Sequence, residues 1–190
     1  GEPLAIMLSK KASRAVKIVL SRIEVFRGTG PVSGTSYSVK MGCKKDGTIT
    51  AASAEMIFQA GPYAGSMYFN APNAMFTRYD LKNVDITAYE VLSNRQKVAS
   101  FRAPCVPQIV FGVEGVVDEM ARKIEMDPID FRLKNACEDG HTTIYGDTWG
   151  PIVFIETLKQ AKESDHYKTP IKEGEGRGAE PDHRQVRLLA

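Results

Sequence analysis

The sequence has few cysteines and no long apolar run. Its 190 residues include three cysteines, Cys43, Cys105 and Cys137, which are far apart and odd in number. Disulfide frameworks and zinc sites need closely paired cysteines, so this spacing fits neither and favours a reducing cytoplasm. No apolar run has the length of a membrane span, and the first residues lack a basic-then-apolar signal sequence. We therefore expect a cytoplasmic protein without a membrane partner.

The charge and composition are ordinary for a globular protein. The formal net charge is +2, and no cluster of Lys and Arg is interleaved with aromatic residues, so a nucleic-acid partner is not expected. This length suits one domain, or one domain with a tail. Periodicity is lost towards the C-terminus, where Gly, Pro and charged residues predominate. We expect one domain over residues 1–165 and an irregular or disordered tail over 166–190.

The hydrophobic pattern mixes strands with helices. Asp46-Gly47 separates two β-prone runs, 36–43 and 49–58, and Asp-Gly between such runs predicts a β-hairpin. Residues 61–73 are rich in Gly, Pro, Ala and Tyr and predict an irregular loop. Periodicity predicts two further strands, over 16–25 and 84–92, and four helices, over 2–11, 108–126, 129–136 and 153–162. Because no regular βαβ repeat is present, we predict an α+β fold with a mixed sheet, a β-hairpin and packed helices.

Two of these helices have specific signals. An apolar stripe predicts the buried face of the helix over 108–126, formed by Ile109, Val113, Val116, Met120 and Ile124. Asp127 and Pro128 supply an N-cap and a first-turn proline for the helix that follows.

A single motif points to function. Residues 100–108, Ser-Phe-Arg-Ala-Pro-Cys-Val-Pro-Gln, lead directly into the longest predicted helix. The motif resembles the aromatic-Arg-Gly/Ala-x-Gly-x-Pro-Gln loop that lies against the molybdenum centre in the xanthine dehydrogenase/aldehyde oxidase family. Other strings resemble the same family in the same order, at residues 2–5, 16–22, 45–49, 79–84 and 127–135. The ordered set identifies the chain as an internal part of the molybdenum-cofactor-binding (large) subunit, with that subunit's fold.

The physical chemistry of the motif is compatible with a cofactor role. A Pro-rich segment that opens a helix presents unpaired N–H groups, which attract anionic or oxo ligands. The resemblance implies that the amide at Arg102 donates to an oxygen ligand of molybdenum. It also implies that Phe101, Arg102 and Ala103 line the cofactor and that Gln108 helps to fix the loop. Pterin sulfurs hold the metal, so we expect no protein metal ligand. From the local residues alone, a surface arginine in a Pro-shaped turn is the alternative.

Departures from the family pattern bear on the substrate. Pro104 and Asn70 stand where purine hydroxylases of the family have a stacking phenylalanine and an arginine, so an aldehyde or a non-purine N-heteroaromatic ring is favoured. Cys105 replaces a loop glycine and is similar to the copper-bridging cysteine of carbon monoxide dehydrogenases, although the neighbouring residues differ; a subunit of that kind is an alternative. Glu2 is either a substrate ligand or a helix N-terminal acid. Pro104, Cys105 and Glu2 are the candidate pocket residues.

The resemblance also implies a mechanism and partners. A molybdenum-pterin cofactor, in its dinucleotide form, would hydroxylate a small-molecule substrate through a metal-bound hydroxide, with hydride transfer to a sulfido ligand of the molybdenum. Iron–sulfur clusters and FAD are expected on partner domains or subunits. The catalytic glutamate and several pterin-binding loops belong to other segments of the molybdenum domain, so the chain alone is predicted to be inactive and free of molybdenum. A non-catalytic interaction module on the same scaffold is the competing hypothesis.

Overall fold

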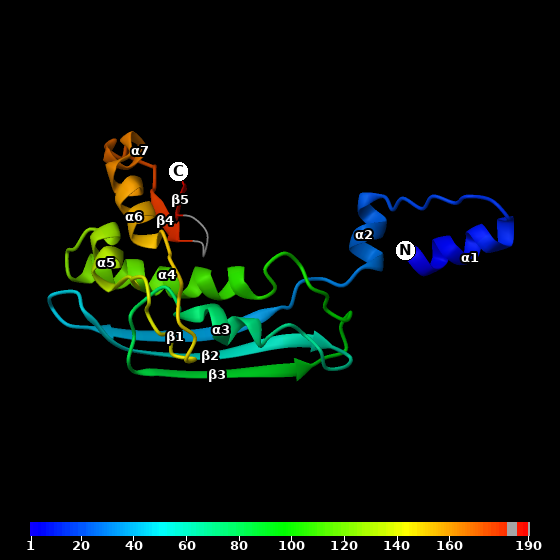
Figure 1. Cartoon of the computed structure of the whole chain (residues 1–190), viewed down its shortest axis with the longest axis horizontal. Helices are drawn as coiled ribbons and strands as arrows, with labels where there is room; N and C mark the ends of the chain where they lie inside the picture. Colours follow the sequence, from blue (N-terminus) through cyan, green and yellow to red (C-terminus); the bar gives the residue numbers. More distant parts are fainter. Residues whose placement is uncertain (182–185, 190) are drawn as a thin grey trace.

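A mixed three-stranded sheet forms the centre of the molecule (Figure 1). The computed structural model describes residues 1–181 and 186–189. The strands are β1 (Thr35–Cys43), β2 (Ile49–Gly61) and β3 (Val84–Leu92), in the order β1-β2-β3. β1 pairs antiparallel with β2, whereas β2 pairs parallel with β3. Gly47, with φ of 87°, allows the tight turn between β1 and β2. The predicted hairpin, the predicted strand over 84–92 and the predicted mixed sheet are confirmed.

Two helices pack on one face of this sheet, α3 (Asn70–Met75) and α4 (Val106–Lys123). Alternate residues of β2 point into the core beneath α4, and the fully buried ones are Met56, Phe58 and Ala60. The long helix is confirmed, and its predicted stripe is right at Ile109, Val113 and Met120. Val117 is buried in place of Val116, which lies at the margin of the face. The predicted irregular loop over 61–73 ends early, because α3 begins at Asn70.

The C-terminal helices stack beyond the end of α4 (Figure 1). They are α5 (Pro128–Asn135), α6 (Phe154–Glu163) and α7 (Asp165–Lys168). The Asp127 side chain accepts the first N–H groups of α5, so the predicted N-cap is confirmed. Two short antiparallel strands follow, β4 (Gly178–Pro181) and β5 (Val186–Leu189). These two strands lie within the predicted tail, and residues 182–185 and 190 lie outside the described ones. The division into a domain over 1–165 and a tail over 166–190 stays a prediction.

The N-terminal arm, residues 1–32, extends away from the sheet (Figure 1). It contains α1 (Glu2–Ala12), which confirms the first predicted helix, and α2 (Arg22–Gly28), and neither helix has a buried residue. The predicted strand over 16–25 is wrong. A capping box between Ser21 and Glu24 starts a helix inside that range. The β-prone residues before Ser21 pair with no strand of the described chain, and a strand without a ladder partner is not stable.

Candidate functional site

The motif of residues 100–108 forms a strained turn at the start of α4. Ala103 and Cys105 have positive φ angles of 52° and 66°. For residues other than glycine this conformation costs roughly 1–2 kcal/mol, so it persists only where the surroundings enforce it. The amide of Val106 donates to the carbonyl oxygen of Ala103 at 3.0 Å and closes the turn. We refer to residues 101–105 as the cofactor loop.

The amides of the cofactor loop are available to an outside acceptor. Among the described residues, no backbone or side-chain group accepts a hydrogen bond from the N–H of Phe101, Arg102 or Ala103. Phe101 is 74% exposed and Arg102 is also exposed, so the first part of the loop faces outward, whereas Cys105 at its end is buried in the core. The first turn of α4 carries no acidic residue. An electropositive cluster of unpaired N–H groups at a helix start fits an oxygen ligand or another anion.

A second segment, residues 93–99, precedes the cofactor loop in the chain and is hydrogen-bonded at one end of the sheet. Its amides donate to two neighbouring segments: that of Val98 to the oxygen of Ala60 at 3.2 Å, and that of Ala99 to the oxygen of Pro31 at 3.0 Å. Two glycines make this approach possible. A Cβ on Gly30 would lie 2.4 Å from the carbonyl oxygen of Lys97, and one on Gly61 would lie 2.6 Å from its Cα. Close backbone packing therefore joins the three segments at one end of the sheet.

Gln108 ties the first turn of α4 to the same junction. Its Nε2 donates to the carbonyl oxygen of Ser33 at 3.4 Å. The Ser33 hydroxyl in turn donates to the carbonyl oxygen of Gln59 at 2.5 Å, on β2. This hydrogen bond connects the first turn of α4 to the residues before β1, and the loop-fixing role of Gln108 stays a prediction.

A pair of charged side chains holds the loop of residues 61–66 at this end of the sheet. Glu90, on β3, accepts hydrogen bonds from the amides of Gly65 and Ser66. These hydrogen bonds, first of all those with Ser66, lower the pKa of the Glu90 carboxyl. Lys97 Nζ donates to the carbonyl oxygens of Tyr63 and Ala64, at 3.1 and 3.2 Å. The 61–66 loop therefore lies beside the segment that leads into the cofactor loop.

The three predicted pocket residues do not all lie in one place. Pro104 and Cys105 are in the cofactor loop, but Cys105 is only 3% exposed, and burial raises the pKa of its thiol. A buried protonated thiol does not favour the copper-binding role. Glu2 begins α1 on the N-terminal arm, away from α4 (Figure 1). Its side chain is 93% exposed, as for a solvated helix N-terminal acid. Asn70 begins α3, after the 61–66 loop.

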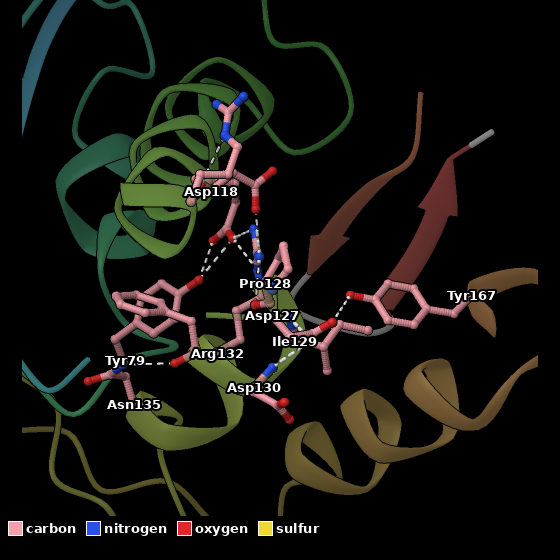
Figure 2. Close-up of polar contacts among 12 residues, drawn as sticks. Tyr79, Asp118, Asp127, Pro128, Ile129, Asp130, Arg132, Asn135 and Tyr167 are labelled. Atoms are coloured by element: carbon pink, nitrogen blue, oxygen red, sulfur yellow. Dashed lines mark hydrogen bonds and ion pairs between the residues drawn. The ribbon is translucent and has the colours of Figure 1, made fainter. Parts of the chain in front are cut away.

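A buried polar network between α4 and α5 was not predicted from the sequence (Figure 2). Arg132, fully buried in α5, contacts Glu114 of α4 through Nε at 3.0 Å and Nη2 at 2.9 Å. Its Nη1 lies 2.7 Å from a carboxylate oxygen of Asp118, and the Tyr79 hydroxyl donates to Glu114 at 2.8 Å. Burial raises the pKa of Glu114, while the positive charges of Arg132 and Arg78 oppose that shift. A buried charge is stable only with such partners.

Asn135 connects this network to the β1–β2 turn. Its Oδ1 accepts the amide of Ile49 at 2.8 Å, and its Nδ2 donates to the carbonyl oxygens of Gly47 and Phe131 at 2.9 and 2.8 Å. The network lies in the interior and has no contact with the cofactor loop, so its role is to fix α4 and α5 on the sheet. A signal was present in the sequence, because Glu114 interrupts the apolar face of α4 and a charge there requires a buried partner.

No group of three or more His, Cys, Asp or Glu side chains is placed to hold a metal ion within residues 1–181 and 186–189. None of the described helices is both long and apolar enough to span a bilayer.

Comparison with known proteins identifies the family. A family model described as a molybdopterin cofactor-binding domain matches residues 1–136, which include the sheet, the cofactor loop and α4. The chain belongs to the molybdopterin cofactor-binding domain family. The resemblance to xanthine dehydrogenases and aldehyde oxidases that the motif suggested is therefore confirmed, as is a molybdopterin cofactor as the group that this domain family binds.

Individual members of the molybdopterin cofactor-binding domain family extend this result. The xanthine dehydrogenase molybdenum-binding subunit of Escherichia coli O157:H7 is 29% identical over 98% of the chain. The nicotinate dehydrogenase large molybdopterin subunit of Eubacterium barkeri is 32% identical over 83%. The chain spans 25% and 38% of these two relatives. The solved structure of the aldehyde oxidoreductase from Desulfovibrio gigas is similar, with a TM-score of 0.65 and 29% sequence identity. The match covers 70% of this chain and 15% of the oxidoreductase chain, and it confirms the α+β fold.

Proposed function

We propose that this chain is the part of a molybdenum hydroxylase that presents the cofactor loop to a molybdenum-pterin cofactor. The observation that carries the proposal is the set of unpaired amides from Phe101 to Ala103, in an exposed turn at the start of α4. These donors suit the oxygen ligands of such a group. When bound, the cofactor supplies the redox chemistry of hydroxylation. The loop's own contribution is to orient and polarise an oxygen through preorganised N–H groups that need no rearrangement.

The individual residues of the cofactor loop have different proposed roles. The amides of Arg102 and Ala103 would donate hydrogen bonds, and the exposed ring of Phe101 would exclude water from one side. Gln108 positions the loop through Ser33. Pro104 and Cys105 shape the turn next to the substrate. Because Pro104 offers no flat ring for a purine, the substrate that we propose is an aldehyde or a non-purine N-heteroaromatic compound.

The remaining parts of the enzyme belong to other segments. We propose that the catalytic glutamate, the other pterin-binding loops, the iron–sulfur clusters and FAD lie on partner domains or subunits, and that the pterin is in its dinucleotide form. The exposed apolar side chains of the N-terminal arm support contact with further segments of the molybdenum domain, because large exposed apolar surfaces mark interfaces. The free thiols of Cys43, Cys105 and Cys137 support a cytoplasmic location.

A loop substitution in the whole enzyme tests this proposal. The polypeptide that carries this chain is co-produced with its partner subunits and assayed with a panel of aldehydes and N-heteroaromatics, together with molybdenum analysis. We expect Ala103→Val to lower kcat/KM at least about tenfold, because a β-branched residue disfavours the φ of 52° and shifts the amides. Ala51→Val, at an exposed position of β2, is the matched control and should leave kcat/KM unchanged.

Two outcomes would contradict the proposal. One is equal activity of the Ala103→Val and Ala51→Val enzymes. The other is stoichiometric molybdenum on the isolated 190-residue chain, since the chain supplies only part of the proposed binding surface. We expect that isolated chain to show no hydroxylase activity and to retain no molybdenum.

A further inference from the structure

The 61–66 loop offers an exposed aromatic ring beside the segment that leads to the cofactor loop. Tyr63 is 61% exposed, although its backbone is firmly held. Lys97 Nζ lies 5.2 Å from the centre of the Tyr63 ring and also donates to the carbonyl oxygens of Tyr63 and Ala64. A single cation therefore fixes both the main chain and the ring, whereas an exposed tyrosine on a free loop would sample many positions.

Glu90 also holds this loop, and we refer to Lys97 and Glu90 together as the clamp. Its carboxylate accepts hydrogen bonds from the amides of Gly65 and Ser66, the two residues that follow Ala64. Carbonyl oxygens and amides of four consecutive residues are thus held by opposite charges, a negative one on β3 and a positive one on the 93–99 segment. A hydrogen bond to a charged group is about twice as strong as a neutral one, so this loop is more rigid than its Gly-rich sequence predicts.

The clamp joins the loop to the site. Lys97 lies four residues before Phe101 in sequence, and its main chain packs on Gly61 at the end of β2. The 61–66 loop and the cofactor loop are therefore joined through the 93–99 segment, and both loops lie at the same end of the sheet (Figure 1). An outward-facing, preorganised aromatic ring at that place suits contact with a flat apolar group.

We propose that Tyr63 is a specificity-determining residue that contacts the ring of an aromatic substrate, and that Lys97 and Glu90 are the positioning residues that hold it. This inference rests on the proposed function and deepens it: the favoured substrates carry an aromatic ring next to the reacting carbon. A small aliphatic aldehyde reaches the cofactor loop without contacting Tyr63, so its turnover does not depend on the clamp.

Kinetics with two aldehydes test the inference in the whole enzyme. Benzaldehyde and propanal share the reacting group and differ in the ring. We expect Tyr63→Ala to lower kcat/KM for benzaldehyde by roughly 3- to 10-fold through a higher KM, the effect of losing one aromatic contact. The value for propanal should stay within about twofold, because no ring contact is lost.

Variants at Lys97 separate positioning from a general effect on the fold. Lys97→Met should shift the benzaldehyde-to-propanal ratio in the same direction as Tyr63→Ala, and Lys97→Arg should preserve the wild-type ratio, since it retains the cation. Arg95→Met is the matched control, because Arg95 is an exposed cation two residues away. Hydrogen exchange gives a readout without turnover: Lys97→Met should speed exchange of the 61–66 amides by roughly tenfold, and Arg95→Met should not.

The outcomes separate this inference from the proposed function. An active wild-type enzyme whose benzaldehyde-to-propanal ratio is the same in all variants overturns the inference and leaves the proposed function standing. Unchanged hydrogen exchange of the 61–66 amides in Lys97→Met also overturns it, because the clamp would then not hold the loop. A wild-type enzyme that oxidises neither aldehyde contradicts the proposed aldehyde activity and the inference together.

Discussion

Apolar side chains are buried in the body of the molecule, residues 33–165, but exposed in the N-terminal arm, residues 1–32. In the body, Phe58 and Ile109 are completely buried. In the arm, Val19 and Phe26 are 73% and 69% exposed. Both regions are rich in apolar residues, so hydrophobicity does not explain the difference. An apolar residue becomes core only where a second element packs on it, and the described chain supplies such an element to the body but not to α1 and α2 of the arm.

Polar residues show the same contrast. In the body, the Arg132 side chain is fully buried between two carboxylates. In the arm, the guanidinium of Arg22 lies 4.9 Å from the centre of the Phe26 ring, at the surface. The body therefore depends on specific partners for its charges, whereas the arm does not. Substitutions should separate the two regions by their effect on the free energy of unfolding.

The largest expected difference is between these two arginines. Arg132→Met removes the partner of two carboxylates and should lower the unfolding free energy of the chain by about 3–5 kcal/mol, because Glu114 would stay buried without compensation. Arg22→Met should lower it by less than about 1 kcal/mol, the value of an exposed cation–π contact. Urea unfolding followed by circular dichroism measures both. Similar losses for the two variants would remove the distinction between body and arm.

A smaller effect is expected at the link between α5 and the β1–β2 turn. Asn135→Ala leaves the buried amide of Ile49 and the carbonyl oxygen of Gly47 without their partner. We expect a loss of about 2–3 kcal/mol in the same unfolding measurement. Asn73→Ala, at an exposed position of α3, is the control and should change stability by less than about 0.5 kcal/mol. A loss below about 1 kcal/mol for Asn135→Ala would show that solvent replaces these hydrogen bonds.

A pH series sharpens the contrast through a buried thiol of the body. Burial, and secondarily the negative charge of Asp80, raises the pKa of Cys137 from 9.0 to about 12. The folded chain therefore holds this proton more tightly than the unfolded chain. Its contribution to stability is complete below pH 9 and is lost as the pH rises towards the folded pKa. The wild-type unfolding free energy should fall more steeply above pH 9 than that of Cys137→Ala, by at most about 1.4 kcal/mol per pH unit. Parallel pH profiles would contradict this expectation.

The smallest effect is expected in the arm. Met7→Ser and Phe26→Ser replace side chains that are 67% and 69% exposed. Met7→Ser should change the unfolding free energy of the 190-residue chain by no more than about 0.5 kcal/mol, because no buried packing is lost. Phe26→Ser should change it by less than about 1 kcal/mol, because it removes only the exposed cation–π contact with Arg22. In the whole enzyme the same variants should reduce assembly, measured by size-exclusion chromatography, if the arm packs on other segments as proposed. A loss clearly above about 1 kcal/mol in the chain alone would mean that α1 or α2 already packs on the body.

Elements with local signals could be predicted from the sequence alone. The Asp46-Gly47 turn, the N-cap at Asp127 and the apolar stripe of α4 each depend on residues close together in the chain, and each is present. The motif of residues 100–108 also placed the candidate site at a helix start. Such features follow from backbone conformation and short-range hydrogen bonds, which one stretch of sequence contains completely.

Which residues have a ladder, ion-pair or packing partner became clear only from the tertiary structure. The β-prone residues before Ser21 form no strand, because no segment of the described chain pairs with them. Local sequence does not reveal whether such a pairing partner exists. The pairing of Glu114 with Arg132, the fixing of the 61–66 loop by Glu90 and Lys97, and the approach of Gly61 to Lys97 join segments distant in sequence. These contacts form only when the packed sheet and helices bring the segments together, since burial and long-range geometry belong to the whole fold.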